Sequence, residues 1–236
     1  MSSTPEQRKD TSCFGSATAK MSTEEDVLRS ASEPFVSGGG VTTADQALRQ
    51  LKEGNRRFVA GEMIHPDQTV DRRREVAKGQ QPFAIIFGCV DSRVPPEIVF
   101  DRGLGDVLVI RTAGHALDSA SLNSVEFGVH ELGIPLVMVL GHQRCGAVAA
   151  TVEAVEKGAK PHGRVGELVA AIKPAVEKVK GQPGDLLDNA VKANIELTVK
   201  KLRTSKSLAE FTERGRIKIV GAHYDLGTGA VEITVS

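Results

Sequence analysis

Cysteine is scarce in this chain, with three cysteines among 236 residues. Two of them, Cys89 and Cys145, lie in short motifs with other metal-binding residue types, and Cys13 lies in a polar N-terminal stretch. This number and placement exclude a framework of disulfide bonds and fit a reducing compartment. We therefore expect a cytoplasmic protein.

The sequence also lacks net charge and long apolar runs. It has 30 basic and 30 acidic residues and no basic stripe with interleaved aromatic residues, so we expect no nucleic-acid partner. No stretch of about 18 apolar residues is present and no apolar signal-peptide segment begins the chain, so we expect no membrane association. The 40% of hydrophobic residues that are present are enough for a sizeable core.

The first 40 residues differ in composition from the rest. Residues 1–40 are rich in Ser and Thr, contain few large apolar residues and end in three consecutive glycines. Such a segment cannot bury enough apolar surface to fold alone, so we expect a disordered tail, with a partner-binding role as the alternative. Residues 41–236 are expected to form the folded domain.

Continuous apolar runs predict the strands of a parallel sheet. The runs at 83–87, 106–111 and 135–141 do not alternate with polar residues, which is typical of strands that are buried on both faces. A later strand at 216–223 is expected to turn back into 231–235 as an antiparallel hairpin.

Helical patterns fill the segments between and after these strands. Thr43 and Gln46 form a capping box, and apolar residues then recur at helical spacing as far as Gly61. Further helices are expected near 71–78, around 122–132 and over most of 145–204. Together these patterns predict an α/β fold. Its central, mostly parallel sheet is flanked by helices, with an N-terminal helical arm and an antiparallel C-terminal edge hairpin.

Two motifs contain the residues with metal-binding chemistry. A Cys-Val-Asp-Ser-Arg motif at 89–93 follows the first apolar strand, and a His-Gln-Arg-Cys motif at 142–145 follows the third. The carboxyl ends of parallel strands are where open α/β sheets bind their ligands. Two thiolates, one imidazole and one carboxylate form a donor set that favours Zn²⁺ over Mg²⁺ or Ca²⁺.

Asp91 has two possible partners in this arrangement. It can serve as a fourth metal ligand, or it can pair with Arg93 through two hydrogen bonds and leave a metal position open. A zinc ion with an open position is typical of a catalytic site. The structural alternative is that Cys89 is a small buried hydrophobe and His142 an ordinary core histidine.

The motifs resemble the signature of the β-class carbonic anhydrases, in particular the bacterial members. The Cys-x-Asp-Ser-Arg and His-x-x-Cys-Gly sequences, the Arg-Thr-Ala-Gly at 111–114 and the glycine before His142 all fit this family. The Leu-Lys-Glu-Gly-Asn at 51–55 is similar to the bacterial type. The resemblance extends from about Ala44 to the C-terminal hairpin.

The resemblance implies an activity and a mechanism. The family hydrates CO₂ reversibly to bicarbonate and a proton by attack of a zinc-bound hydroxide, assisted by an Asp–Arg dyad. It therefore implies one zinc ion per chain, held by Cys89, His142 and Cys145. Asp91 would be the exchangeable fourth ligand, and Arg93 would form the dyad with it.

The resemblance also implies an assembly and a substrate pocket. Family members are homodimers or dimers of dimers, with the N-terminal helical arm on the partner. The expected arm helix could equally pack on its own domain. Gln80 and Phe127 match pocket positions, the former across the dimer interface, and the backbone N–H of Gly146 would help to hold the substrate.

Three positions correspond to a regulatory bicarbonate site in some members. Ile86 replaces the tryptophan of that site, whereas Arg111 and Tyr224 match it, and Arg111 could instead be a structural ion-pair residue. Two other functions stay open. One is hydrolysis of carbonyl sulfide or carbon disulfide on the same fold, and the other is a non-catalytic scaffold stabilised by zinc.

Overall fold

The computed structural model describes residues 43–159 and 163–236, so the expected tail at 1–40 lies outside the described residues. Five strands form one sheet in the order β2-β1-β3-β4-β5, in which β5 is antiparallel to β4 and all other neighbours are parallel. Their bounds are Ala84–Cys89 for β1, Val107–Thr112 for β2, Leu136–His142 for β3, Lys218–Tyr224 for β4 and Val231–Val235 for β5. The expected α/β architecture is confirmed.

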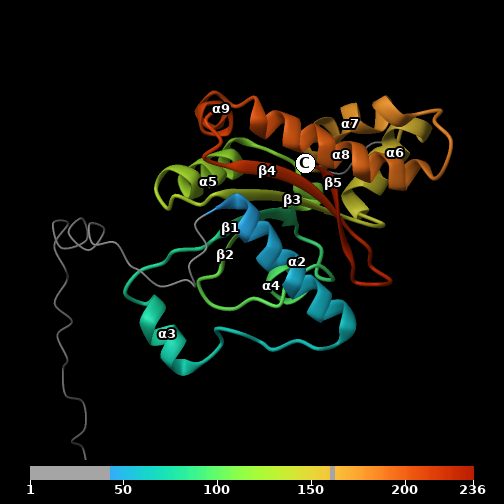
Figure 1. Cartoon of the computed structure of the whole chain (residues 1–236). Helices are drawn as coiled ribbons and strands as arrows, with labels where there is room; N and C mark the ends of the chain where they lie inside the picture. The colour runs from blue at the N-terminus through green and yellow to red at the C-terminus, as the bar shows by residue number, and fades with distance from the viewer. Residues whose placement is uncertain (1–42, 160–162) are drawn as a thin grey trace, which may run out of the picture. The chain divides into compact units, whose positions relative to one another are not determined.

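Helices cover both faces of the sheet (Figure 1). One face carries α5 and α8, with α6 and α7 packed against α8, and the other face carries α2 and α4. The helices are α2 Ala44–Ala60, α3 Val70–Val76, α4 Pro96–Val99, α5 Ser119–His130, α6 Gly146–Lys157, α7 Val165–Val179, α8 Leu186–Arg203 and α9 Lys206–Glu213, with a 3₁₀ turn, η1, at Ala113–His115. None of the helices in the described part of the chain is long and apolar enough to cross a membrane.

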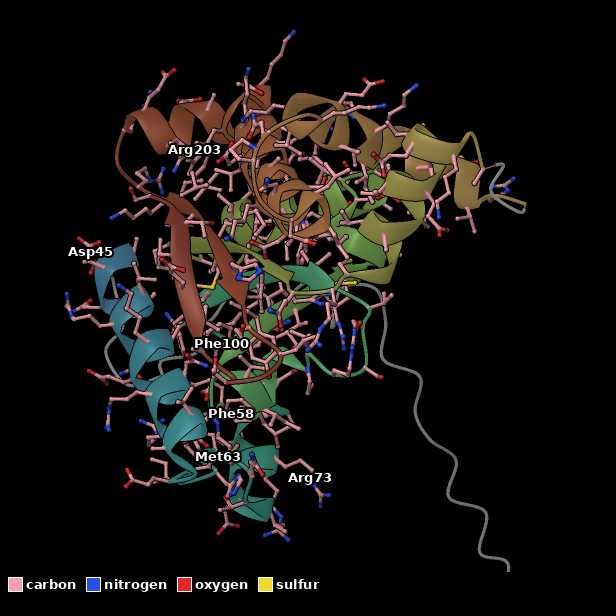
Figure 2. All side chains as sticks on the ribbon, turned by 90° about the vertical axis from the view of Figure 1, so that its right-hand side faces the viewer. Asp45, Phe58, Met63, Arg73, Phe100 and Arg203 are labelled. Atoms are coloured by element: carbon pink, nitrogen blue, oxygen red, sulfur yellow. The ribbon has the colours of Figure 1, made fainter. Side chains whose placement is uncertain are left out.

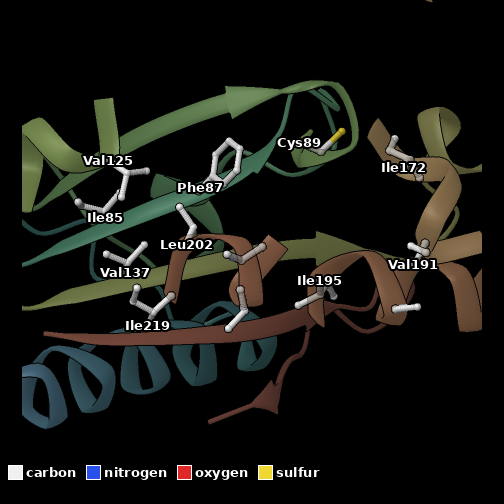
Figure 3. Close-up of a cluster of buried hydrophobic side chains, with 14 of the residues drawn as sticks. Ile85, Phe87, Cys89, Val125, Val137, Ile172, Val191, Ile195, Leu202 and Ile219 are labelled. Atoms are coloured by element: carbon white, nitrogen blue, oxygen red, sulfur yellow. The ribbon is translucent and has the colours of Figure 1, made fainter. Parts of the chain in front are cut away.

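Strand β1 shows why the central apolar runs do not alternate. Ile85 and Phe87 belong to the core under α5 and α8 (Figure 3). Ala84 and Ile86 belong to the core under α2. Successive side chains of a strand point to opposite faces, so a strand between two cores needs apolar residues at every position. The prediction of full burial is confirmed for β1 and β3.

The same prediction is wrong for β2. All six of its residues are only partly buried, because β2 forms one edge of the sheet. A continuous apolar run identifies a strand with a core on both faces, but it does not say whether a neighbouring strand covers each edge. The apolar character of β2 therefore leaves a partly exposed apolar edge on the chain.

Helix α2 begins and ends where its caps predict. Thr43 and Gln46 form both hydrogen bonds of the capping box, and Gly61 ends the helix with a left-handed φ of 71°. The buried face of α2 includes Ala47 and Leu51 and packs against the chain's own sheet (Figure 2). Of the two expectations for the arm helix, packing on its own domain is the one that the structure shows for this face.

The structure explains why the Leu-Lys-Glu-Gly-Asn segment ends in glycine and asparagine. A Cβ atom on Gly54 would lie 1.8 Å from the carbonyl oxygen of Phe100, so only glycine allows α2 to approach this close. Asn55 donates to the carbonyls of Val99 and Gly229, at 3.1 and 2.8 Å, and accepts from the N–H of Val231 at 2.9 Å. This asparagine therefore ties α2 to the end of α4 and to the β4–β5 turn.

One of the C-terminal helices contains a proline, and the helical region is longer than expected. Pro174 lies inside α7, which runs without interruption from Val165 to Val179. The helical region also continues beyond Thr204 as α9. Proline removes one main-chain hydrogen bond, but the burial of Ile172, Ala175 and Val176 on either side holds this helix to the core.

Gly54→Ala should lower the free energy of unfolding by about 3 kcal/mol or more, because the methyl group would meet main-chain atoms that cannot move aside. Chemical denaturation monitored by circular dichroism measures this. Glu53→Ala, an exposed change in the same turn of α2, is the matched control and should have little effect. A Gly54→Ala protein of wild-type stability would contradict the close approach.

Candidate metal centre

The two motifs meet at the carboxyl ends of β1 and β3. These strands are parallel neighbours, paired from Ile85 with Val137 to Gly88 with Leu140. Cys89 and His142 are the last residues of β1 and β3, so both side chains reach the same edge of the sheet. Cys145 is the N-cap residue of α6, which begins directly after β3 and its short turn. Figure 3 shows the Cys89 sulfur at the end of β1.

The three side chains form a cluster that can hold a metal ion. The donor atoms of Cys89, His142 and Cys145 lie within 4.8 Å of one another, and all three residues are buried. The sulfur atoms of Cys89 and Cys145 are 4.0 Å apart. Two sulfurs that bind one tetrahedral zinc at about 2.3 Å are separated by about 3.8 Å, so the spacing fits such an ion.

The imidazole of His142 is oriented as a ligand. Its Nδ1 lies 2.9 Å from the carbonyl oxygen of Gln143, which can only accept a hydrogen bond, so Nδ1 carries the proton. The lone pair is then on Nε2, which is buried and has no hydrogen-bond partner among the described residues. A buried, unpartnered acceptor beside two sulfurs fits a metal donor, and the carbonyl bond is the usual orienting contact of such a histidine.

The two thiols do not behave alike. The pKa of Cys89 is lowered to about 3, mainly because the Cys145 thiol donates a hydrogen bond to its sulfur. The same contact, together with burial, raises the pKa of Cys145. A divalent cation that binds both sulfurs as thiolates would displace the proton of Cys145.

Asp91 is bound to Arg93 in this structure. The guanidinium donates to both carboxylate oxygens, at 2.9 and 2.7 Å, and the N–H of Arg93 donates to Oδ1 at 3.0 Å. These contacts hold the pKa of Asp91 well below its usual range. Asp91 Oδ2 is 3.8 Å from His142 Nε2, so the carboxylate lies beside the donor cluster while it pairs with Arg93.

Comparison with known proteins identifies the family. The carbonic anhydrase family model matches residues 84–231, which span both motifs. Carbonic anhydrase 2 of Mycobacterium tuberculosis is 46% identical over 184 residues, 78% of this chain and 89% of that protein. The carbonic anhydrase of Mycolicibacterium smegmatis is 43% identical over 188 residues, 79% of this chain and 91% of its own length. The chain belongs to the β-carbonic anhydrase family.

A solved structure of the family agrees with this assignment. The β-carbonic anhydrase CafA of Aspergillus fumigatus superposes with a TM-score of 0.62 at 26% identity, over 80% of this chain and 89% of that chain. Carbonic anhydrases hydrate CO₂ reversibly, and the chain is therefore an enzyme of this class. The Cys–His–Cys cluster lies within the residues that the family model matches.

The structure gives a reason for the Arg-Thr-Ala-Gly segment of this carbonic anhydrase. The Nε of Arg111 donates to the carbonyl of Cys89 at 2.7 Å, and its Nη2 donates to the carbonyl of Asp91 at 2.6 Å. The guanidinium therefore spans the main chain between the ligand strand and Asp91. The observed partners of Arg111 are carbonyl groups and not the carboxylate of the expected ion pair, and its match to the regulatory site stays a prediction.

The three expected pocket residues are all exposed in the single chain. Gly146 is the first residue of α6, next to Cys145, and it is exposed. Gln80 is exposed on the segment before β1, and Phe127 is 52% exposed on α5. A single chain does not test whether Gln80 and Phe127 complete a site on a partner, so their roles stay predictions.

Cys145→Ser should lose most of the bound metal, because a serine hydroxyl is a much weaker ligand for a soft or borderline metal than a thiolate. Elemental analysis after dialysis measures the metal content, and circular dichroism checks the fold. Cys13→Ser is the matched control and should retain the full content. Full retention in Cys145→Ser would remove Cys145 from the ligand set.

Proposed function

We propose that this chain catalyses the reversible hydration of CO₂ to bicarbonate and a proton, with one zinc ion per chain held by Cys89, His142 and Cys145. The observation that carries the proposal is the placement of Asp91. Its carboxylate lies beside the three donors but is held by Arg93, which leaves a fourth position for a reacting water. The soft sulfur donors favour zinc among the common metals of such sites.

Each group has a distinct task in this proposal. When bound, zinc supplies the positive charge that makes water a nucleophile at neutral pH. With the metal bound, Asp91 would accept a hydrogen bond from the attacking water and would orient it toward the carbon of CO₂. Arg93 fixes the carboxylate through two hydrogen bonds, and Arg111 holds the main chain below it. The N–H of Gly146, at the start of α6, would bind a substrate oxygen.

The two remaining functions make different predictions for the same assay. Stopped-flow measurements with CO₂, carbonyl sulfide and carbon disulfide on the zinc-loaded chain separate them. Rapid turnover of CO₂ supports the proposal. Turnover of only the sulfur-containing gases would identify a hydrolase, and no turnover of any gas would identify a scaffold. The paired Asp91 and Arg93 favour the enzyme, since a purely structural zinc site does not need the arginine.

We further propose that the active form is a homodimer or a dimer of dimers in the cytoplasm. Apolar side chains are exposed around the β2 edge, including Val90 at 55%, Leu104 at 42% and Phe127 at 52%. Leu104 precedes β2, and the N–H of Val90 donates a hydrogen bond to the carbonyl of Thr112 at the end of β2. Helix α5, which carries Phe127, packs on β2. A second chain would cover this edge and bring Gln80 and Phe127 to the partner's site. The two buried free cysteines fit a reducing cytoplasm.

Arg93→Ala should lower CO₂ turnover by about 100-fold, as expected when a group that orients a reacting water loses its support, while the zinc content is unchanged. Asp91→Asn should have a comparable effect, because a neutral amide is a weaker acceptor. Arg74→Ala breaks another Arg–Asp pair, with Asp71 at 3.2 Å, and is the matched control. Wild-type turnover in Arg93→Ala would leave Arg93 with no catalytic role.

Phe127→Lys should dissociate the oligomer, because a charge would be buried at the proposed interface. Multi-angle light scattering at micromolar concentration measures the mass, and turnover should fall as the monomer appears. Val165→Lys changes an exposed apolar residue on α7, 43% exposed, and should leave the mass unchanged. A fully active wild-type monomer would contradict the shared site.

A further inference from the structure

A buried asparagine of α8 reaches the segment beside the metal cluster. Asn194 is 2% exposed, and its Nδ2 donates to the carbonyl of Gly114 at 2.9 Å. The same Nδ2 lies 2.9 Å from Nε2 of His115, which is 1% exposed. Neither Asn194 nor His115 belongs to the motifs that hold the metal or the Asp–Arg pair.

The contacts of Asn194 fix the orientation of its amide and the tautomer of the histidine. The atom that faces the Gly114 carbonyl must be the NH₂ group, because two oxygens would repel each other. The second N–H of that group then points at His115 Nε2, which must accept. His115 is therefore neutral with its proton on Nδ1, in agreement with a pKa that burial lowers to about 4.

Gly114 connects Asn194 to the metal cluster. Its N–H donates to the sulfur of Cys89 at 3.2 Å, while its carbonyl receives the bond from Asn194. Gly114 has a left-handed φ of 61°, and a Cβ atom there would come within 2.9 Å of Ile172 and 3.0 Å of Ala147. The residue is thus enclosed on one side by α6 and α7 and held on the other by α8.

We propose that Asn194 is a positioning residue of the metal centre. It holds Gly114 so that the Gly114 N–H points at the Cys89 sulfur and draws charge away from that ligand. The inference deepens the proposed zinc-dependent function and rests on it.

The proposed bond addresses a chemical difficulty of this donor set. Two thiolates give a metal much negative charge and so weaken its ability to activate water. An N–H hydrogen bond to a ligand sulfur reduces that donation, and such contacts tune metal sites in proteins. Arg93 and Arg111 do not serve this purpose, since their hydrogen bonds go to oxygens.

The test compares Asn194→Ala with wild type in the full chain loaded with Co²⁺ or with Zn²⁺. Without Asn194 the sulfur donates more charge. The sulfur-to-cobalt absorption band should therefore move to longer wavelength, and the pH of half-maximal CO₂ hydration should rise. Turnover at neutral pH should fall by about 10-fold or more, the usual range for partners of metal ligands.

Asn55→Ala is the matched control for this experiment. Asn55 is also a buried asparagine whose Nδ2 donates to two carbonyls, those of Val99 and Gly229, but it lies on α2. Both substitutions should lower thermal stability. Only Asn194→Ala should shift the cobalt spectrum and the pH profile, so an unshifted spectrum in a folded, cobalt-loaded Asn194→Ala protein would overturn the proposal.

A measurement on wild type covers the case in which Asn194→Ala does not fold. In protein loaded with ¹¹³Cd²⁺, a scalar coupling between the Gly114 amide proton and the metal is expected across the N–H···S bond, and its absence would overturn the proposal. Asn194→Ser, which keeps one donor, should weaken that coupling. The proposed function has its own test, because it would be contradicted only if the zinc-loaded wild-type protein did not hydrate CO₂.

Discussion

The short distance between two buried sulfur atoms is the constraint on which the rest of the site depends. The sulfurs of Cys89 and Cys145 are 4.0 Å apart, and two thiolates at this distance repel each other strongly away from water. A proton or a cation must lie between them. The main chain also stabilises negative charge on the sulfurs. The N–H of Gly114 faces Cys89, and the N–H groups of Ala147 and Val148, at the start of α6, face Cys145.

The sheet itself brings the two sulfurs and His142 together, with little contribution from distant loops. Because β1 and β3 are parallel neighbours, Cys89 and His142 are brought together by strand pairing, and α6 adds Cys145 at its first turn. The adjacent strand β2 supplies Arg111, which holds the carbonyls on either side of Val90. The position of Asp91 is therefore set by main-chain contacts as well as by its own pairing with Arg93.

Most of this arrangement could be predicted from the sequence, because β1 and β3 are unbroken apolar runs that each end at a metal-binding residue. The ends of α2 could also be predicted, because the capping contacts of Thr43, Gln46 and Gly61 involve only residues close to them in the sequence. The edge position of β2 could not be predicted, because apolar character does not reveal which strands are neighbours. The role of Asn194 was also missed, as only the packing of α8 brings it to Gly114. The roles of Gln80 and Phe127 stay predictions, because they depend on a second chain.

The contacts divide the site into a fixed part and a movable part. The three donors are themselves buried at strand and helix ends, and Asn194 holds the Gly114 segment that contacts Cys89. Arg93, by contrast, is exposed, and Asp91 is only partly buried. The Asp91 carboxylate, 3.8 Å from His142 Nε2, would need only a small movement to exchange Arg93 for a metal ion held by the three donors. Any rearrangement of the site should therefore begin at Asp91 and Arg93, while the donors keep their places.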